Sequence, residues 1–322
     1  MNAIKIAYLF DPTTEMTGYT IKRAQYFQHH FDQVIHFFVK SPLPFHAAFT
    51  TYTTQPELHR LLSDYEPTLV IRDAGRSARE DIQFLHLLGS RVAVLDDSGD
   101  GAMYADLQLQ TLYTEDMEGS EKHVRLGLQA YLPIVLPEPL EANRKTKRIV
   151  IAFPEKDPEN LTHRVLRHLA LLHVPLEVDV VIHPQYQHDR FALQSFCLQR
   201  KHIQLIETDD CLPFLATADL AVTSSAHMPY LCLQTATPAV LLAETKREVG
   251  YRFGDELDAF THLGLGRKIK QSALQNAVME VVLHDGLLSR KKQQLEKLAS
   301  TIHPEDLLLE LQTLAELREF TS

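Results

Sequence analysis

The chain has 322 residues, 45% of them hydrophobic, and a formal net charge of −10 at pH 7 from 32 basic and 42 acidic side chains. This length is enough for two ordinary domains with their own cores. The acidic balance argues against nucleic acid as the main partner, because phosphate backbones require concentrated Lys and Arg. No apolar run approaches the roughly 20 residues needed to span a bilayer.

The N-terminus and the cysteines both favour a cytoplasmic protein. Residues 1–10, MNAIKIAYLF, run straight into a predicted strand and lack the layout of a signal peptide. The three cysteines, Cys197, Cys211 and Cys232, form no CxxC motif and no ligand-like pattern. We therefore expect them to serve as small apolar residues in a reducing compartment.

Motifs for common cofactors are missing. Glycine is scarce, at 12 of 322 residues, and neither a dinucleotide fingerprint nor a phosphate-binding P-loop is present. A Rossmann oxidoreductase is therefore a poor interpretation, since its GxGxxG turn lets the backbone approach phosphate. The 17 histidines include no HExxH motif and form no ligand pattern with carboxylates. We expect neither a resident cofactor nor a metal.

Strand-like runs alternate with helical patterns in chain order. Strands are predicted at 4–10, 33–39, 68–71, 92–95, 149–153, 177–182, 203–207, 219–223 and 239–243. Several are continuous runs of Val, Ile, Leu and Ala, which is typical of strands buried on both faces of a parallel sheet. Amphipathic helices are predicted at 19–30, 57–65, 78–88 and 161–173. Right-handed βαβ units in series give an α/β fold with doubly wound sheets.

The pattern breaks once, near residues 133–147, where three prolines are followed by a charged run of low hydrophobicity. The strand pattern then begins again at residue 149. We therefore predict an N-terminal Rossmann-like domain over residues 1–140 and a C-terminal, nucleotide-binding Rossmann-like domain over 148–303. Residues 304–322 have leucines at helical spacing and are predicted to form a terminal helix.

The segment of residues 149–169 runs from an apolar strand through a charged loop into a helix. Ligands of open α/β sheets bind at the carboxyl ends of strands, and Asp157 and Asn160 stand at this loop-to-helix junction. Pro154 and Glu155 occupy the place where a phosphate-binding loop would carry glycines. Pro154 removes an N–H donor, and Glu155 brings negative charge to where a diphosphate would lie.

Polar residues also follow other predicted strands, and each has two interpretations. Asp96 and Asp97 either form a helix cap or turn, or belong to a site at a strand end. Ser225 and His227 are either a serine N-cap with a surface histidine or a hydroxyl-lined anion site. Glu244 either caps a helix or forms an ion pair, or else binds ribose or sugar hydroxyl groups.

Five segments carry a resemblance to known proteins: TEMTGYTIKRAQ, RVAVLDDSGDGAMYADLQL, IAFPEKDPENLTHRVL, ATADLAVTSSAHMPYLCLQTATPAVLLAET and LSRKKQQLEKLAS. Two Rossmann-like halves joined near the middle are the plan of GT-B glycosyltransferases. The chain resembles the UDP-sugar hydrolase of pseudaminic acid biosynthesis and the G-type spore coat polysaccharide biosynthesis proteins of Bacillus-like bacteria. This resemblance implies two Rossmann-like domains in a GT-B arrangement, each with a mostly parallel sheet, and a cleft between them.

In the first domain, one residue of the family pattern is replaced in this sequence and others are retained. The presumed catalytic histidine of the hydrolases is replaced by Tyr19, which is a poor general base at neutral pH. The alternative interpretation is that Tyr19 has a structural role, as an aromatic side chain that packs at the start of a helix and stabilises it. The basic residue one helical turn later is matched by Lys22, or by Arg23 after a shift of one residue. Asp96 and Asp97 match a pair of aspartates in the family.

In the second domain, the resemblance implies a phosphate-binding site in which several of the family's residues are replaced. The glycine pair after the first strand is replaced by the proline and glutamate described above, although Asp157 and Asn160 are kept. The next glycine loop reads Ser-Ala-His-Met at residues 225–228, and the ribose-binding glutamate is replaced by Leu231. Glu244 is retained, while its neighbours differ from the family pattern.

The resemblance implies a cytoplasmic protein of spore coat or surface polysaccharide biosynthesis that binds or acts on a nucleotide-linked sugar. If it is active, water attacks a UDP-sugar, with Tyr19 and Asp97 as the catalytic residues. The residues expected to bind substrate or nucleotide are Asp96, Asp157, Asn160, Ser225, His227 and Glu244. Two alternatives stay open: a catalytically inactive scaffold, whose partners include other polysaccharide biosynthesis proteins, and a glycosyltransferase with an altered donor.

Overall fold

The structure is a computed structural model, and it describes residues 4–11, 17–40, 46–117, 122–133 and 146–317. Most of the predicted linker, residues 134–145, lies outside the described residues, as do Thr14, Glu15 and Met16 of the first resemblance segment.

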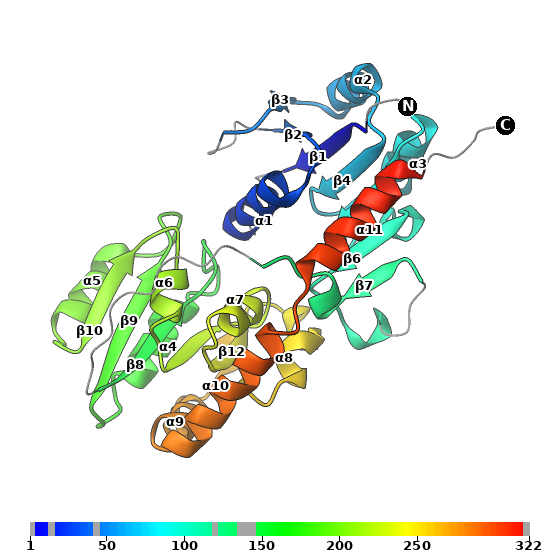
Figure 1. Ribbon diagram of the computed structural model, residues 1–322. Helices are drawn as coiled ribbons and strands as arrows, with labels where there is room; N and C mark the ends of the chain where they lie inside the picture. Colours follow the sequence, from blue (N-terminus) through cyan, green and yellow to red (C-terminus); the bar gives the residue numbers. More distant parts are fainter. Residues whose placement is uncertain (1–3, 12–16, 41–45, 118–121, 134–145, 318–322) are drawn as a thin grey trace. The chain divides into compact units, whose positions relative to one another are not determined.

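The chain divides into two compact units (Figure 1). The first unit holds Met1–Tyr113, Met117–Ile134 and Ile302–Ser322, and the second holds Thr114–Asp116 and Val135–Thr301. The C-terminal helix, α11, therefore belongs to the first unit although it follows the whole of the second in sequence. No helix among the described residues is long and apolar enough to cross a membrane.

The first unit is a seven-stranded parallel sheet covered by helices on both faces. Its strands are β1 (Ile6–Phe10), β2 (Ile35–Val39), β3 (Phe49–Thr51), β4 (Leu69–Asp73), β5 (Arg91–Leu95), β6 (Leu107–Gln110) and β7 (Val124–Leu126). Its helices are α1 (Thr17–His30), α2 (Gln55–Tyr65), α3 (Arg79–Leu87) and α11 (Pro304–Glu316). The strand order is β3-β2-β1-β4-β5-β6-β7, so the direction of winding reverses between β1 and β4.

Two hydrophobic clusters fill the two faces of this sheet. Buried residues of α1 and α11 pack on one face, against the side chains that β1 and β2 direct toward that face. Buried residues of α2 and α3 pack on the other face. Because β1, β2, β4 and β5 contribute side chains to both clusters, these strands read as mostly apolar runs in the sequence.

The second unit repeats the plan with six parallel strands in the order β10-β9-β8-β11-β12-β13. The strands are β8 (Lys147–Ala152), β9 (Leu176–Ile182), β10 (Ile203–Glu207), β11 (Leu220–Ser224), β12 (Ala239–Ala243) and β13 (Phe260–Leu265). The helices are α4 (Leu161–Leu169), α5 (Arg190–Leu198), α6 (Leu212–Leu215), α7 (Met228–Gln234), α8 (Arg252–Glu256), α9 (Gln271–Val282) and α10 (Asp285–Ala299). Here the winding reverses between β8 and β11.

The predicted fold class, α/β with two Rossmann-like domains built on parallel sheets, is confirmed. Four strands were not predicted. β3 and β7 have only three residues each, and β6 alternates Leu with Gln. β13 contains Gly264 at φ +75° and pairs with β12 through a shifted register. None of the four is a long β-branched run, which is the signal that reveals a buried parallel strand.

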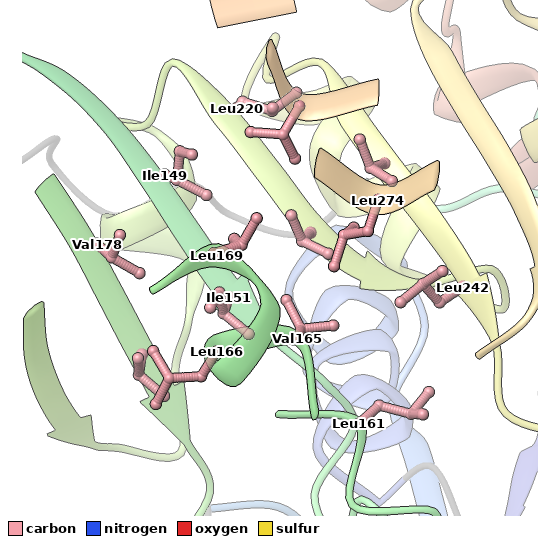
Figure 2. Packing of buried hydrophobic residues seen from close by; sticks show 14 of the residues in the cluster. Ile149, Ile151, Leu161, Val165, Leu166, Leu169, Val178, Leu220, Leu242 and Leu274 are labelled. Carbon is pink, nitrogen blue, oxygen red and sulfur yellow. The ribbon is translucent and has the colours of Figure 1, made fainter. Parts of the chain in front are cut away.

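The core of the second unit depends on one face of α4 (Figure 2). Leu161, Val165, Leu166 and Leu169 recur at helical spacing and are at most 4% exposed. Figure 2 shows them beside strand residues such as Ile151, in one continuous apolar cluster. Burial of this stripe fixes α4 on the sheet, and it thereby fixes the loop that precedes α4 at the carboxyl end of β8.

Leu166→Ala is expected to destabilise the second unit by about 2–5 kcal/mol, because it removes buried methyl groups and leaves a cavity. Urea unfolding followed by circular dichroism measures this change. Leu171→Ala is the matched control, since Leu171 is 54% exposed and the same truncation there opens no cavity. Equal losses for the two variants would contradict the packing described here.

Candidate functional site

Three loops meet along the carboxyl edge of the second sheet. They follow β8, β11 and β12, which are neighbours in the sheet and run parallel, so their ends lie at one edge. The hydroxyl of Thr223 in β11 donates to the carbonyl oxygen of Ala152 in β8, directly where the winding reverses. In doubly wound folds, ligands bind outside the strand ends at this point. The predicted residues Asp157, Asn160 and Ser225 are thus brought to one edge.

Asp157 closes the loop that follows β8. Its Oδ1 accepts from the Leu161 N–H at 2.7 Å and its Oδ2 from the Thr162 N–H at 2.9 Å, and the residue is 1% exposed. A ring nitrogen of His188 lies 2.6 Å from the Asp157 carbonyl oxygen. The first N–H groups of α4, which could bind a phosphate, are therefore occupied by the protein's own carboxylate.

Asn160 also shapes this loop. Its backbone is left-handed, at φ 52°, as is that of Asp157 at φ 44°. Asn and Asp tolerate this conformation better than most residues, which explains why both stand in this tight turn. The Asn160 Oδ1 accepts from the Tyr186 hydroxyl at 2.8 Å, so its amide joins the loop to the segment after β9.

The loop after β11 carries buried polar groups. Ser224, Ser225 and His227 are 0%, 3% and 4% exposed, so the surface-histidine interpretation of His227 is wrong. The Ser225 hydroxyl donates to the Glu248 carbonyl oxygen at 3.3 Å. The Ser224 hydroxyl oxygen is buried and has no hydrogen-bond partner within the described part of the chain. Such a group is costly unless a water or a ligand satisfies it.

Glu244 lies at the end of β12 beside a second carboxylate that sequence reasoning missed. Glu244 and Glu248 are each 8% exposed. The Glu244 N–H donates to Glu248 Oε2 at 2.9 Å, and the Thr245 hydroxyl donates to Glu248 Oε1 at 3.1 Å. Glu248 thus fixes the loop that presents Glu244. Its position four residues later is the sequence signal that could have revealed it.

In the first unit a buried arginine gathers the polar residues at the end of the sheet. The Arg23 guanidinium donates to Asp73 at 2.5 and 2.8 Å and to Asp96 Oδ2 at 2.7 Å. The Tyr8 hydroxyl donates to the same Asp73 carboxylate at 2.6 Å. We call Tyr8, Arg23, Asp73 and Asp96 the Arg23 cluster. Arg23 is 4% exposed, whereas the neighbouring Lys22 is half-buried, so Arg23 is the cation that pairs with the predicted aspartate.

Tyr19 is buried beside this cluster. It is 7% exposed, and its ring lies 5.1 Å from the Arg23 guanidinium carbon. Burial, opposed by the charge of Arg23, raises the pKa of the Tyr19 hydroxyl well above its usual value of 10. Tyr19 is therefore neutral at pH 7, and a neutral phenol is no base.

Asp96 and Asp97 both hold loops in place. Asp96 is left-handed, at φ 46°, and its Oδ1 accepts from the Thr111 N–H and hydroxyl at 2.6 and 2.8 Å. Asp97 is 2% exposed; Arg72 lies 3.0 Å from its Oδ2, and the Ser77 and Gly99 N–H groups donate to its Oδ1. The carboxylate of Asp97 thus joins three separate segments of the first unit.

Sequence reasoning missed a cavity of ≈ 270 Å³ at the carboxyl edge of the first sheet. Asp11 and Lys40, which follow β1 and β2, form an ion pair at 2.5 Å in its wall. Burial and the Asp11 carboxylate raise the pKa of Tyr52 to about 12, and Arg72 opposes that rise. The lining comes from β1, β4, the helices α2 and α3 and the segments after the first four strands, so no local sequence motif predicts this cavity.

Comparisons with known proteins identify the fold but no family. No protein-family model matches the chain. An uncharacterized protein of Methanocaldococcus jannaschii is 28% identical over 107 residues, which span 32% of this chain and 22% of that protein's length.

Several solved structures share the fold at low identity. MurG of Acinetobacter baumannii superposes with a TM-score of 0.67 at 14% identity, covering 97% of this chain and 100% of that one. The UDP-GlcNAc 2-epimerase of Neisseria meningitidis bound to UDP-GlcNAc gives 0.60 at 11%, covering 91% and 94%. A putative UDP-N-acetylglucosamine 2-epimerase of Listeria monocytogenes gives 0.61 at 10%, covering 91% of each chain. The chain therefore has the fold of GT-B glycosyltransferases and UDP-GlcNAc 2-epimerases.

Within the described residues, no group of three or more His, Cys, Asp or Glu side chains is placed to hold a metal ion. Cys197, Cys211 and Cys232 form no disulfide among the described residues, and Cys197 and Cys232 are buried. Burial raises the pKa of the Cys197 thiol to about 11, so this thiol stays protonated at neutral pH.

Arg23→Gln is expected to destabilise the first unit by about 3–5 kcal/mol, because it leaves the buried carboxylate of Asp73 and the partly buried carboxylate of Asp96 without their cation. Amide hydrogen exchange in β1 and β4 should accelerate accordingly. Arg60→Gln is the control: Arg60 is 67% exposed in an ion pair with Asp64, and its loss should leave exchange unchanged. Unchanged protection in Arg23→Gln would show that the cluster is not structural.

Asp157→Ala is expected to cost the second unit about 1–2 kcal/mol, because two N–H groups of α4 lose their acceptor and alanine is strained at positive φ. Hydrogen exchange of the first turn of α4 reports the loss locally. Asp189→Ala is a matched change, since Asp189 caps α5 through one bond to the Ala192 N–H at 3.0 Å. A loss of protection at α5 in both variants would contradict a local capping role.

Proposed function

We propose that the chain binds a nucleotide-linked sugar, with the nucleotide at the carboxyl edge of the second sheet. The observation that carries this proposal is the buried polar group Ser224, Ser225, His227 and Glu244 at the reversal of the winding. A buried hydroxyl that lacks a partner in the described structure suits a ligand with hydrogen-bonding oxygens. Fold relatives such as the Staphylococcus aureus MnaA structure with UDP support the same ligand class.

In this proposal, Ser225, His227 and Glu244 bind the ligand, while Asp157 and Asn160 shape the loop beside it. Asp157 already occupies the α4 N–H groups, and Glu155 adds a negative charge to the same loop. Both features weaken diphosphate binding, so we expect the nucleoside and the sugar to contribute most of the affinity. The site therefore favours binding over rapid release of a diphosphate product.

We further propose that the protein is a cytoplasmic binding protein of surface or spore coat polysaccharide biosynthesis, without UDP-sugar hydrolysis. Tyr19 is neutral and Asp97 has its carboxylate engaged by three segments, so neither is poised to activate water. We assign Asp96 and Asp97 positioning roles in the first unit.

Glycosyl transfer is the second candidate. The cavity of the first unit favours it, because Asp11, Lys40 and Tyr52 offer donors and acceptors suited to a hydroxyl-bearing acceptor. An acceptor-dependent release of nucleotide would distinguish transfer from binding alone.

A thermal-shift screen against UDP, CMP, dTDP, GDP and UDP-N-acetylglucosamine tests the binding proposal. A ligand at about 100 times its Kd stabilises by about 2.7 kcal/mol, which moves the unfolding midpoint by a few degrees. We expect a shift with uridine nucleotides. No shift with any of the five compounds would overturn the proposal.

Pro154→Gly/Glu155→Gly is expected to bind UDP about 3- to 10-fold more tightly than the native chain, because it restores an N–H donor and removes a repulsive charge. Calorimetric titration measures the change. Glu280→Gln is the control, since it removes an exposed negative charge from α9 of the same unit. An equal gain in the control would assign the effect to overall charge, and no gain would mean that the diphosphate lies elsewhere.

A further inference from the structure

A groove of ≈ 490 Å³ runs along α4, between the end of α5 and the start of α9. His163, Arg164, Arg167 and His168 line it from α4, and Arg200 lines it from beyond α5. Their spacing places the α4 residues on the face opposite to its core stripe. We call this set the α4 groove. Its rim reaches the loop after β8, but its charged residues lie along the helix.

Among the described residues, Glu159 supplies the single carboxylate that lines the α4 groove beside these positive charges. The guanidinium groups of Arg164 and Arg167 form no ion pair and no hydrogen bond within the described part of the chain. The Arg200 guanidinium carbon lies 3.8 Å from the centre of the Phe196 ring, and its Nη1 donates to the Phe196 carbonyl oxygen at 2.9 Å. Glu159, the acid at the rim, faces Arg267 at 4.0 Å.

This concentration of cations contrasts with the whole chain, whose net charge is −10. Arg164 and Arg167 are three residues apart on one helix, where like charges repel and destabilise the helix. Arg200 adds a third cation from another element. A cluster of this kind is relieved when an anion binds between the guanidinium groups, which present paired N–H donors in a fixed fork.

Two histidines in the groove can add further donors. Partial burial, followed by the charge of Arg167, lowers the pKa of His163; Asp189 opposes this effect, and His188 adds to it. Partial burial and the charges of Arg164 and Arg167 lower the pKa of His168. The His168 Nε2 is buried and has no partner among the described residues. A bound anion would satisfy this nitrogen and favour protonated imidazoles.

We propose that the α4 groove binds a small ligand that carries two or more linked phosphate groups. Three guanidinium groups and two imidazoles exceed what one phosphate can engage, and the volume suits a short phosphate chain. Phe196 and Leu171 give the groove an apolar wall beside the charges. This site uses none of Ser225, His227 or Glu244, and it shares with the nucleotide-sugar site proposed above only Asn160 at its rim.

Calorimetric titration of the full chain with inorganic triphosphate and with ATP tests the proposal. We expect both to bind, and Arg164→Gln/Arg167→Gln to weaken both at least about tenfold, because two charge-assisted contacts are lost. Equal affinities for triphosphate and ATP would show that the groove recognises the phosphates alone. Tighter binding of ATP would indicate that the nucleoside also contacts the apolar wall. Orthophosphate should bind more weakly than triphosphate.

Arg290→Gln/Lys297→Gln is the matched control, since it removes two exposed positive charges from α10 of the same unit. A loss of affinity equal to that of the α4 variant would overturn the proposal, because it would reduce binding to overall charge. A native Kd for triphosphate weaker than about 1 mM would overturn it as well. Histidine NMR gives a second readout: triphosphate should raise the pKa values of His163 and His168, and unchanged values would exclude the groove.

Discussion

Parallel strand pairing is the constraint on which both units depend. Because all strands of a sheet point the same way, every loop after a strand opens at one edge, and polar residues far apart in sequence are gathered there. The reversal of winding, between β1 and β4 in the first unit and between β8 and β11 in the second, leaves room for side chains between diverging connections. The candidate sites of both units follow from this arrangement of the strands.

The polar and charged groups at the carboxyl edge of the sheet are paired differently in the two units. In the first, the Arg23 cluster places a buried guanidinium between two carboxylates, so the protein itself supplies the counter-ion of both. In the second, the Asp157 carboxylate accepts from the first N–H groups of α4, while the end of β11 buries the Ser224 hydroxyl, which has no hydrogen-bond partner among the described residues. These contacts explain how a chain with 12 glycines closes the loops at its strand ends without the glycine-rich turn that a phosphate-binding loop uses.

The fold could be predicted from the sequence because continuous apolar runs such as β1 and β12 leave few other assignments. The short strands β3 and β7 could not, since three residues carry no periodicity. The sequence places Asp157 near the start of a helix. It does not predict the left-handed backbone of this residue or the two hydrogen bonds that its carboxylate accepts. The choice between Lys22 and Arg23 needed the register of α1 on the sheet. The cavity beside Asp11 and Lys40 escaped prediction because its walls come from separate segments that meet only after folding.

The place of α11 has a consequence for synthesis of the chain. Leu307, Leu308 and Leu311 are buried against the first sheet, although more than a hundred and fifty residues of the second unit separate them from the strands that they cover. During translation the first sheet therefore emerges with one face incompletely covered. The helix α11 can cover that face only after it has left the ribosome. The second unit, which is nearly continuous in sequence, can complete its core before then. The order of maturation thus runs opposite to the order of synthesis.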